Sequence, residues 1–281
     1  MAILTRTPLV ASLLLASSGC ERAPTNVDVT AHSITVHAVL SAGSDTATVL
    51  VTRPSPQRKA HQPSGTLPVK NAHVRLVHGA DTVVLSSTRS CWSNVGEVTA
   101  AGCYAAHVPG GIRAAATYEL LVNIRGEEPI HGSTRVPPPP LILEPAESAA
   151  PPVLRMTPPT VLTARWSGAD ADSRTELRFA ADRADCTAFI ARPDGDAGFL
   201  HIAVTGPDTA TVIAAVHCGQ PPADSYAARF VVTVYDDSYT RYAERLGESS
   251  QPSRTSVGLT GAFGVFGAAA SSATPVVLTM Q

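Results

Sequence analysis

The stretch ITVHAVLSAGSDTATVLVTR, residues 34–53, decides the fold class. In its first part Ile34, Val36, Ala38 and Leu40 take every second position, and Ala47, Val49 and Val51 repeat the pattern further on. Side chains two apart lie on the same face of a strand, so each part predicts a strand with one apolar face. SAGSD, residues 41–45, supplies turn residues between them. The stretch therefore predicts a β-hairpin.

The same alternation continues on both sides of a proline-rich middle. Before it, strands are predicted at residues 71–79, 81–87, 102–108 and 117–124; after it, they are predicted at residues 160–168, 176–181, 187–191, 199–205, 210–217 and 227–236. Residues 238–246, SYTRYAERL, are the one segment with a helical pattern. Many short strands and little helix predict an all-β fold of the β-sandwich class.

The proline-rich middle, VPPPPLILEPAESAAPPVL at residues 136–154, predicts an extended polyproline spacer. We expect a signal peptide at residues 1–19, a tether at 20–30, a first β-sandwich at 31–136, a linker at 137–154 and a second β-sandwich at 155–281. The last 27 residues, 255–281, carry no charge. Their small side chains and Pro275 favour buried strands around a glycine-rich turn over a transmembrane helix.

The first 20 residues have the zones of an export signal. Arg6 gives a positive start, an apolar run follows from Leu9 to Ala16, and small residues lead directly into Cys20. This order resembles the lipobox of bacterial lipoproteins, in which the cysteine is acylated and becomes the new N-terminus. Ser17 departs from that motif, which usually has Leu there. We expect lipidation at Cys20 and a place in the cell envelope, at the outer membrane; a secreted or a cytosolic protein are the alternatives.

Four cysteines remain if Cys20 carries lipid, an even number that fits an oxidising compartment. They fall into one local pair in each half of the chain, Cys91 with Cys103 and Cys186 with Cys218. We expect two disulfides, and four free thiols are the alternative.

Composition and motifs exclude several functions. The 21 basic and 23 acidic side chains nearly balance, which argues against nucleic acid as a partner. There is no HExxH, no GxSxG and no glycine-rich phosphate loop, and no cofactor is expected. Two acidic loops are weak calcium candidates or ordinary turns; their residues are Asp170, Asp172, Asp194 and Asp196. Asp236 and Asp237 lie among tyrosines, but neighbouring carboxylates on a strand end do not flank a sugar as glycoside hydrolysis requires.

Several short motifs together resemble a known family. LPVKNAHVRLVHG, GCYAAHV and TYELLVNI resemble the N-terminal half of the DUF4249 family of bacterial lipoproteins and the carboxypeptidase regulatory-like, transthyretin-type sandwich. The matching positions are Pro68, Val69, Ala72, Val74, Leu76, Gly102, Tyr104 and Tyr118. GAFGVFGA, residues 261–268, is similar to the family's glycine-rich ending. The resemblance implies an envelope lipoprotein of unassigned activity, built from two tandem immunoglobulin-like or transthyretin-like β-sandwiches. Such proteins are sometimes associated with TonB-dependent receptors, and the resemblance carries over no catalytic residues.

We therefore expect a lipid-anchored binding or scaffolding module rather than an enzyme, held to the membrane by lipid and contacting another envelope protein. Loops at the ends of the sandwiches would form its recognition surface. One alternative is a secreted hydrolase whose site is assembled from distant loops. Another is a structural subunit of an envelope receptor or transport complex.

Overall fold

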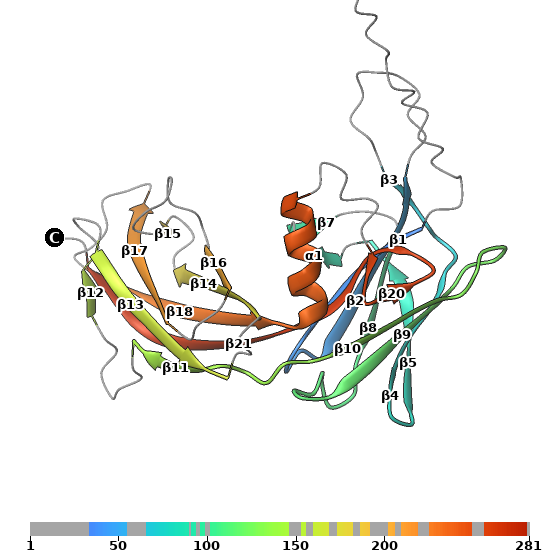
Figure 1. Ribbon diagram of the computed structural model, residues 1–281, viewed down its shortest axis with the longest axis horizontal. Helices are drawn as coiled ribbons and strands as arrows, with labels where there is room; N and C mark the ends of the chain where they lie inside the picture. Colours follow the sequence, from blue (N-terminus) through green and yellow to red (C-terminus); the bar gives the residue numbers. More distant parts are fainter. Residues whose placement is uncertain are drawn as a thin grey trace, which may run out of the picture.

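The structure, a computed structural model, describes residues 34–54, 66–89, 91–93, 96–98, 102–145, 153–155, 160–168, 173–181, 186–191, 202–205, 209–218, 225–248 and 256–279. Strands make up most of these residues, and the one helix among them stands between two strand-built halves (Figure 1). The all-β class predicted from the alternation is confirmed, in a sandwich-type arrangement.

The predicted hairpin is present. β1 (Thr35–Ser41) and β2 (Thr46–Pro54) pair antiparallel, with Val36 opposite Val51. The alternating apolar side chains of both strands are almost fully buried in one core, as their period of two requires. On the other face of β1, His37 and Val39 are half-buried beneath the helix.

The first half is a β-sandwich that contains this hairpin. Its further strands are β3 (Thr66–Pro68), β4 (His73–His78), β5 (Asp81–Thr88), β8 (Cys103–His107), β9 (Thr117–Asn123) and β10 (Ile130–Arg135). The strand order is β1-β2-β8-β5-β4-β9-β10, and β3 pairs with β2 outside this order. β6 (Cys91–Ser93) and β7 (Gly96–Val98) form a small sheet of their own. Tyr104 ties this core together: its hydroxyl donates to Val69 O at 2.7 Å and accepts from Ala72 N at 2.9 Å.

The second half places two sheets beside each other. One holds β11 (Leu141–Glu144), β13 (Thr160–Ser167), β17 (Thr209–Cys218) and β15 (Cys186–Ala191) in that order. The other holds β16 (Ile202–Thr205), β14 (Arg174–Ala181), β18 (Ser225–Tyr235) and the last strand, which β12 (Val153–Arg155) also joins. Trp166 of β13, Leu177 of β14 and Phe230 of β18 are fully buried in the second half. The structure differs from the predicted linker at 137–154 in that residues 141–144 pair with β13.

One long strand serves both halves. β21 (Phe263–Thr279) runs beneath β18 along the lower side of the second half in Figure 1 and continues toward β1. It pairs parallel with β1 as far as Ala269, opposite Ser41, and from Ala269 onward it pairs antiparallel with β18, beginning at Tyr235. The two halves therefore share a strand. That residues 137–154 separate two independent domains stays a prediction.

The uncharged C-terminal segment forms strands, as predicted. β19 (Ser256–Val257) pairs with β21, and β20 (Leu259–Thr260) pairs with β10. Across the described ranges, no helix has both the length and the apolar character needed to cross a membrane.

The predicted helix is α1 (Asp237–Glu248). Tyr239 and Tyr242 of α1 pack with Val257 and Val265 against the outer face of β21. Its other side reaches the second half, where Arg174 N donates to Thr240 Oγ1 at 3.0 Å. The helix thus lies at the joint between the two halves.

Candidate functional site

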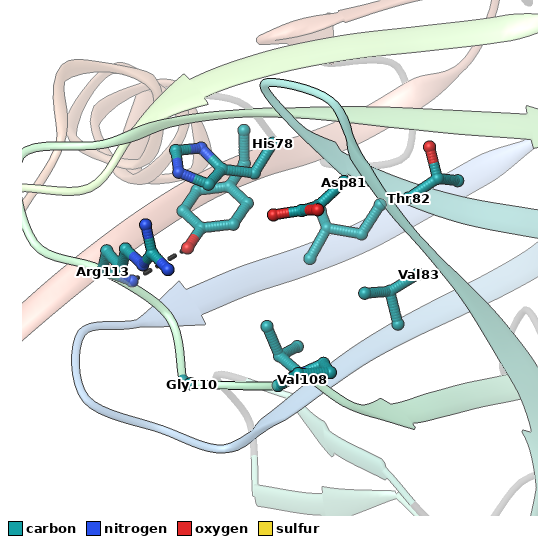
Figure 2. Close-up of a pocket in the computed structure, with 11 residues that line it drawn as sticks. His78, Asp81, Thr82, Val83, Val108, Gly110 and Arg113 are labelled. Atoms are coloured by element: carbon teal, nitrogen blue, oxygen red, sulfur yellow. Dashed lines mark hydrogen bonds between the residues drawn. The ribbon is translucent and has the colours of Figure 1, made fainter.

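A pocket opens at one end of the first sandwich because β5 changes partners along its length. Near its end, from Ser86 to Thr88, β5 pairs with β8; along Asp81–Leu85 it pairs with β4. Toward its start β5 therefore has no pairing with β8, and the space between them is a pocket of about 480 Å³ (Figure 2). This volume is within the roughly 300–1,000 Å³ of small-molecule sites.

The floor of the pocket is apolar. Leu76 and Val108 are buried members of the sandwich core, and Val83 of β5 is half-buried. Figure 2 shows Val83 and Val108 on one side of the pocket, opposite His78. An apolar group that enters the pocket would therefore rest on the core itself, which favours its transfer from water.

The loop between β8 and β9 is firmly held. Val108 N donates to Asp45 O at 2.7 Å, and Ile112 N donates to Ser44 O at 2.7 Å. Gly111 has a φ of 73°, and a Cβ there would lie 3.3 Å from Ser44 O. Glycine is the residue that adopts this left-handed conformation without strain. The β1–β2 turn thus fixes the loop that forms one wall of the pocket.

Tyr118 organises the rim. Its ring is buried and stacks against the His78 ring with centroids 4.7 Å apart. Its hydroxyl accepts a hydrogen bond from Arg113 N at 2.8 Å, drawn as a dashed line in Figure 2. His78 Nδ1 lies 3.0 Å from Thr117 O, so that nitrogen carries the proton and donates. The backbone of Arg113 is fixed while its guanidinium reaches into solvent.

Two opposite charges flank the opening. Asp81 at the start of β5 and Arg113 in the β8–β9 loop are both exposed and both line the pocket. Figure 2 shows the Asp81 carboxylate and the Arg113 side chain apart from each other, on different loops. Among the residues that the structure describes, neither side chain has an ion-pair partner. The pocket therefore offers one cationic and one anionic group to a ligand.

His78, Asp81 and Thr82 all line this pocket, which brings a histidine, a carboxylate and a hydroxyl together. Nucleophilic catalysis needs a hydrogen-bonded relay from carboxylate to base to nucleophile. Over the described ranges no hydrogen bond joins these three side chains, and His78 Nδ1 is directed to a backbone carbonyl instead. Among all the residues that the structure describes, no three or more His, Cys, Asp or Glu side chains are placed to hold a metal ion.

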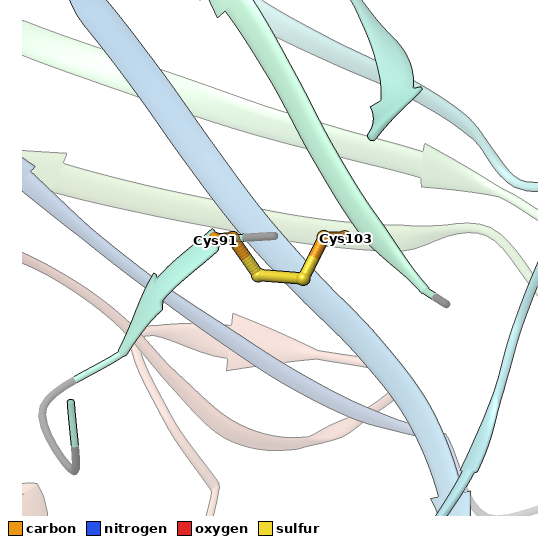
Figure 3. Close-up of a disulfide and its surroundings, with 2 residues drawn as sticks. All are labelled: Cys91 and Cys103. Atoms are coloured by element: carbon orange, nitrogen blue, oxygen red, sulfur yellow. A yellow bond between two sulfur atoms is a disulfide. The ribbon is translucent and has the colours of Figure 1, made fainter. Parts of the chain in front are cut away.

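The disulfide predicted between Cys91 and Cys103 is present, with the two Cα atoms 5.5 Å apart (Figure 3). It joins the start of β6 to the start of β8, at the end of β8 opposite the pocket. Cys186 and Cys218 are directly opposite each other in the β15–β17 register, although their side chains lie outside the described part. Cys20 and the calcium candidates Asp170, Asp172, Asp194 and Asp196 also lie outside it.

Asp236 is a structural carboxylate that sequence reasoning considered only for catalysis. Its Oδ1 accepts from Tyr239 N at 3.0 Å and from Ala268 N at 2.9 Å, so it caps α1 and holds that helix to β21. Its Oδ2 accepts from the hydroxyl of Thr134, on β10. Burial raises the pKa of Asp236, and these hydrogen bonds oppose the rise. An aspartate directly before a helical pattern is the sequence signal for this cap.

Sequence reasoning missed the pocket. The sequence patterns assign no role to His78, Asp81 or Arg113. The turn residues around them, HGAD at 78–81 and PGG at 109–111, indicate loops at one end of the strands. They do not show that the two loops meet, because that depends on pairing between distant strands.

The fold and this pocket together define a β-sandwich protein with a ligand-sized opening at a loop end. The chain belongs to the DUF4249 family, described as a domain of unknown function, whose family model matches residues 21–187.

Two solved structures match the chain with low sequence identity and low TM-scores. Titin Ig tandem domains A164–A165 match at 7% identity with a TM-score of 0.21, covering 89% of this chain and 98% of that one. The structure of Dpr2 Ig1-Ig2 in complex with DIP-Theta Ig1-Ig3 matches at 9% identity with a TM-score of 0.22, covering 88% of this chain and 66% of the other. No curated protein matches the chain.

Proposed function

We propose that this chain is a lipid-anchored protein of the cell envelope that acts as a binding module and performs no catalysis. The observation that carries the binding role is the pocket at the loop end of the first sandwich, with an apolar floor and two charges that lack partners among the described residues. Binding sites are typically concave and apolar, with a few polar groups that fix the orientation of the ligand.

The anchor is proposed from the sequence. Residues 1–19 have the composition of an export signal, and Cys20 follows directly. Acyl chains on Cys20 would hold the protein at the membrane, because more than one chain makes such anchoring stable. The first described strand begins at Thr35, so a short segment would separate the lipid from the sandwich.

The anchor is tested by expressing the full chain in a bacterium that processes lipoproteins and following the incorporation of labelled palmitate. We expect the wild type to be labelled and to fractionate with membranes. Cys20→Ala should lose both properties. Labelling that persists in Cys20→Ala would contradict lipidation at this residue.

The binding role is tested separately, by extracting the native protein from membranes and identifying what co-purifies with it. We expect a ligand or envelope partner whose recovery falls when Asp81 and Arg113 are changed to Asn and Gln. Arg178 and Glu244 are exposed residues outside the pocket and supply the matched control, Arg178→Gln with Glu244→Gln. Equal recovery from the two double variants would place the binding surface elsewhere.

A further inference from the structure

The two charges at the pocket mouth indicate which ligand it takes, and this inference rests on the binding role proposed above. Asp81 and Arg113 have opposite charge, and neither is neutralised by an ion pair within the described ranges. A ligand with a single charge would be attracted by one of these groups and repelled by the other. A ligand with both charges satisfies both groups at once.

The separation of the two groups argues for an extended ligand. Asp81 lies at the tip of the β4–β5 hairpin and Arg113 in the loop before β9, and Figure 2 shows the two side chains apart from each other. In a free amino acid both charges are attached to one carbon atom. A short peptide has its ammonium and its carboxylate at opposite ends, which suits two charged groups that project from different loops.

The rest of the pocket fits the middle of such a peptide. Leu76, Val83 and Val108 form an apolar floor beneath the two charges, where an apolar side chain would be removed from water. The walls are set before the ligand arrives, because Tyr118 holds Arg113 N and the β1–β2 turn holds the neighbouring loop. A pocket that is already ordered loses less entropy when it binds.

We propose that the pocket binds a short peptide with free ends and an apolar residue, its carboxylate on Arg113 and its ammonium on Asp81. The guanidinium suits the carboxylate because it presents paired N–H donors in the geometry of two carboxylate oxygens.

Calorimetric titration of the purified full chain tests this, with the tripeptide Ala-Leu-Ala, its N-acetylated form and its C-amidated form as probes. We expect the free tripeptide to bind, and each blocked form to bind roughly fivefold more weakly, as loss of one exposed charge pair predicts. In Asp81→Asn, acetylation should no longer matter, while amidation still does. In Arg113→Gln the pattern should reverse. Arg178→Gln and Glu244→Gln should behave as the wild type.

The outcomes separate this inference from the broader binding role. If none of the three peptides binds while the pocket variants still lose the co-purifying partner, the pocket has another ligand and the peptide inference is overturned. If the blocked and free peptides bind equally to every variant, Asp81 and Arg113 do not contact the peptide ends. This result also overturns the peptide inference. Binding of the free peptide with the crossed pattern of losses supports it.

Discussion

The hydroxyl of Thr134 donates a 2.6 Å hydrogen bond to the carboxylate of Asp236, a residue 102 positions later in the chain. Thr134 is in β10 of the first half, and Asp236 directly follows β18 of the second. The same carboxylate also caps α1 and holds β21. Three elements from different parts of the sequence thus meet at one half-buried carboxylate.

Thr134→Val should destabilise the protein. Valine keeps the shape of threonine but removes the donor, so the half-buried carboxylate of Asp236 would lose one of its hydrogen bonds. Bonds to charged groups contribute about 1.5–3 kcal/mol, and we expect a loss in the lower part of that range in chemical unfolding. Thr233→Val is the control, because the hydroxyls of Thr233 and Ser271 form a hydrogen bond that is exposed to solvent. Equal losses in both variants would show that the bond to Asp236 is not special.

How much of this arrangement the sequence predicts depends on the range of the interactions. The hairpin at residues 34–53, the Cys91–Cys103 pair and α1 are local patterns, and each is present. The parallel pairing of β1 with β21 joins residues more than 200 positions apart, and no local pattern encodes it. No local pattern encodes the pocket either, because its walls depend on where the pairing between β5 and β8 ends. Alternation specifies which face of a strand is buried, but not which strand lies beside it.

His37 gives the free energy of unfolding a defined pH dependence. Burial lowers the pKa of His37 below its ordinary value of 6.5, and its ring lies against Tyr242, with centroids 5.5 Å apart. The unfolded chain therefore takes up a proton at a higher pH than the folded chain does. The stability that His37 contributes is present above about pH 6.5 and is lost as the pH falls through the folded pKa.

Urea unfolding at a series of pH values from about 7.5 to about 5 measures this effect. The wild type should lose stability more steeply than His37→Gln, which has no titrating ring. His73→Gln, at an exposed position of β4, should follow the wild type. Parallel curves for the wild type and His37→Gln would show that His37 does not stay neutral in the fold.

Gly267 sets how closely α1 approaches β21. A Cβ at this position would lie 2.9 Å from Asp236 Oδ1 and 3.0 Å from Tyr239 Cβ. Gly267→Ala should therefore push the first turn of α1 away from the strand, at about 1–3 kcal/mol of stability. Hydrogen exchange should show faster exchange throughout α1. Gly126→Ala, where a Cβ meets nothing within 4 Å, is strained only in its own backbone and should leave exchange in α1 unchanged.

A second disulfide, between Cys186 and Cys218, is predicted from the backbone register. The two residues are direct partners in antiparallel strands β15 and β17. Such partners have Cα atoms roughly 4.5–5.5 Å apart, and disulfides span roughly 4.4–6.8 Å. Peptide mapping of unreduced, exported protein should find Cys91 with Cys103 and Cys186 with Cys218.

Removing the second bridge with a double serine variant should reduce stability by about 2–4 kcal/mol, through the freedom regained by the unfolded chain. If Cys186 reacts with a thiol reagent without prior reduction, the second bridge is absent, and the register brings the two residues together for packing alone.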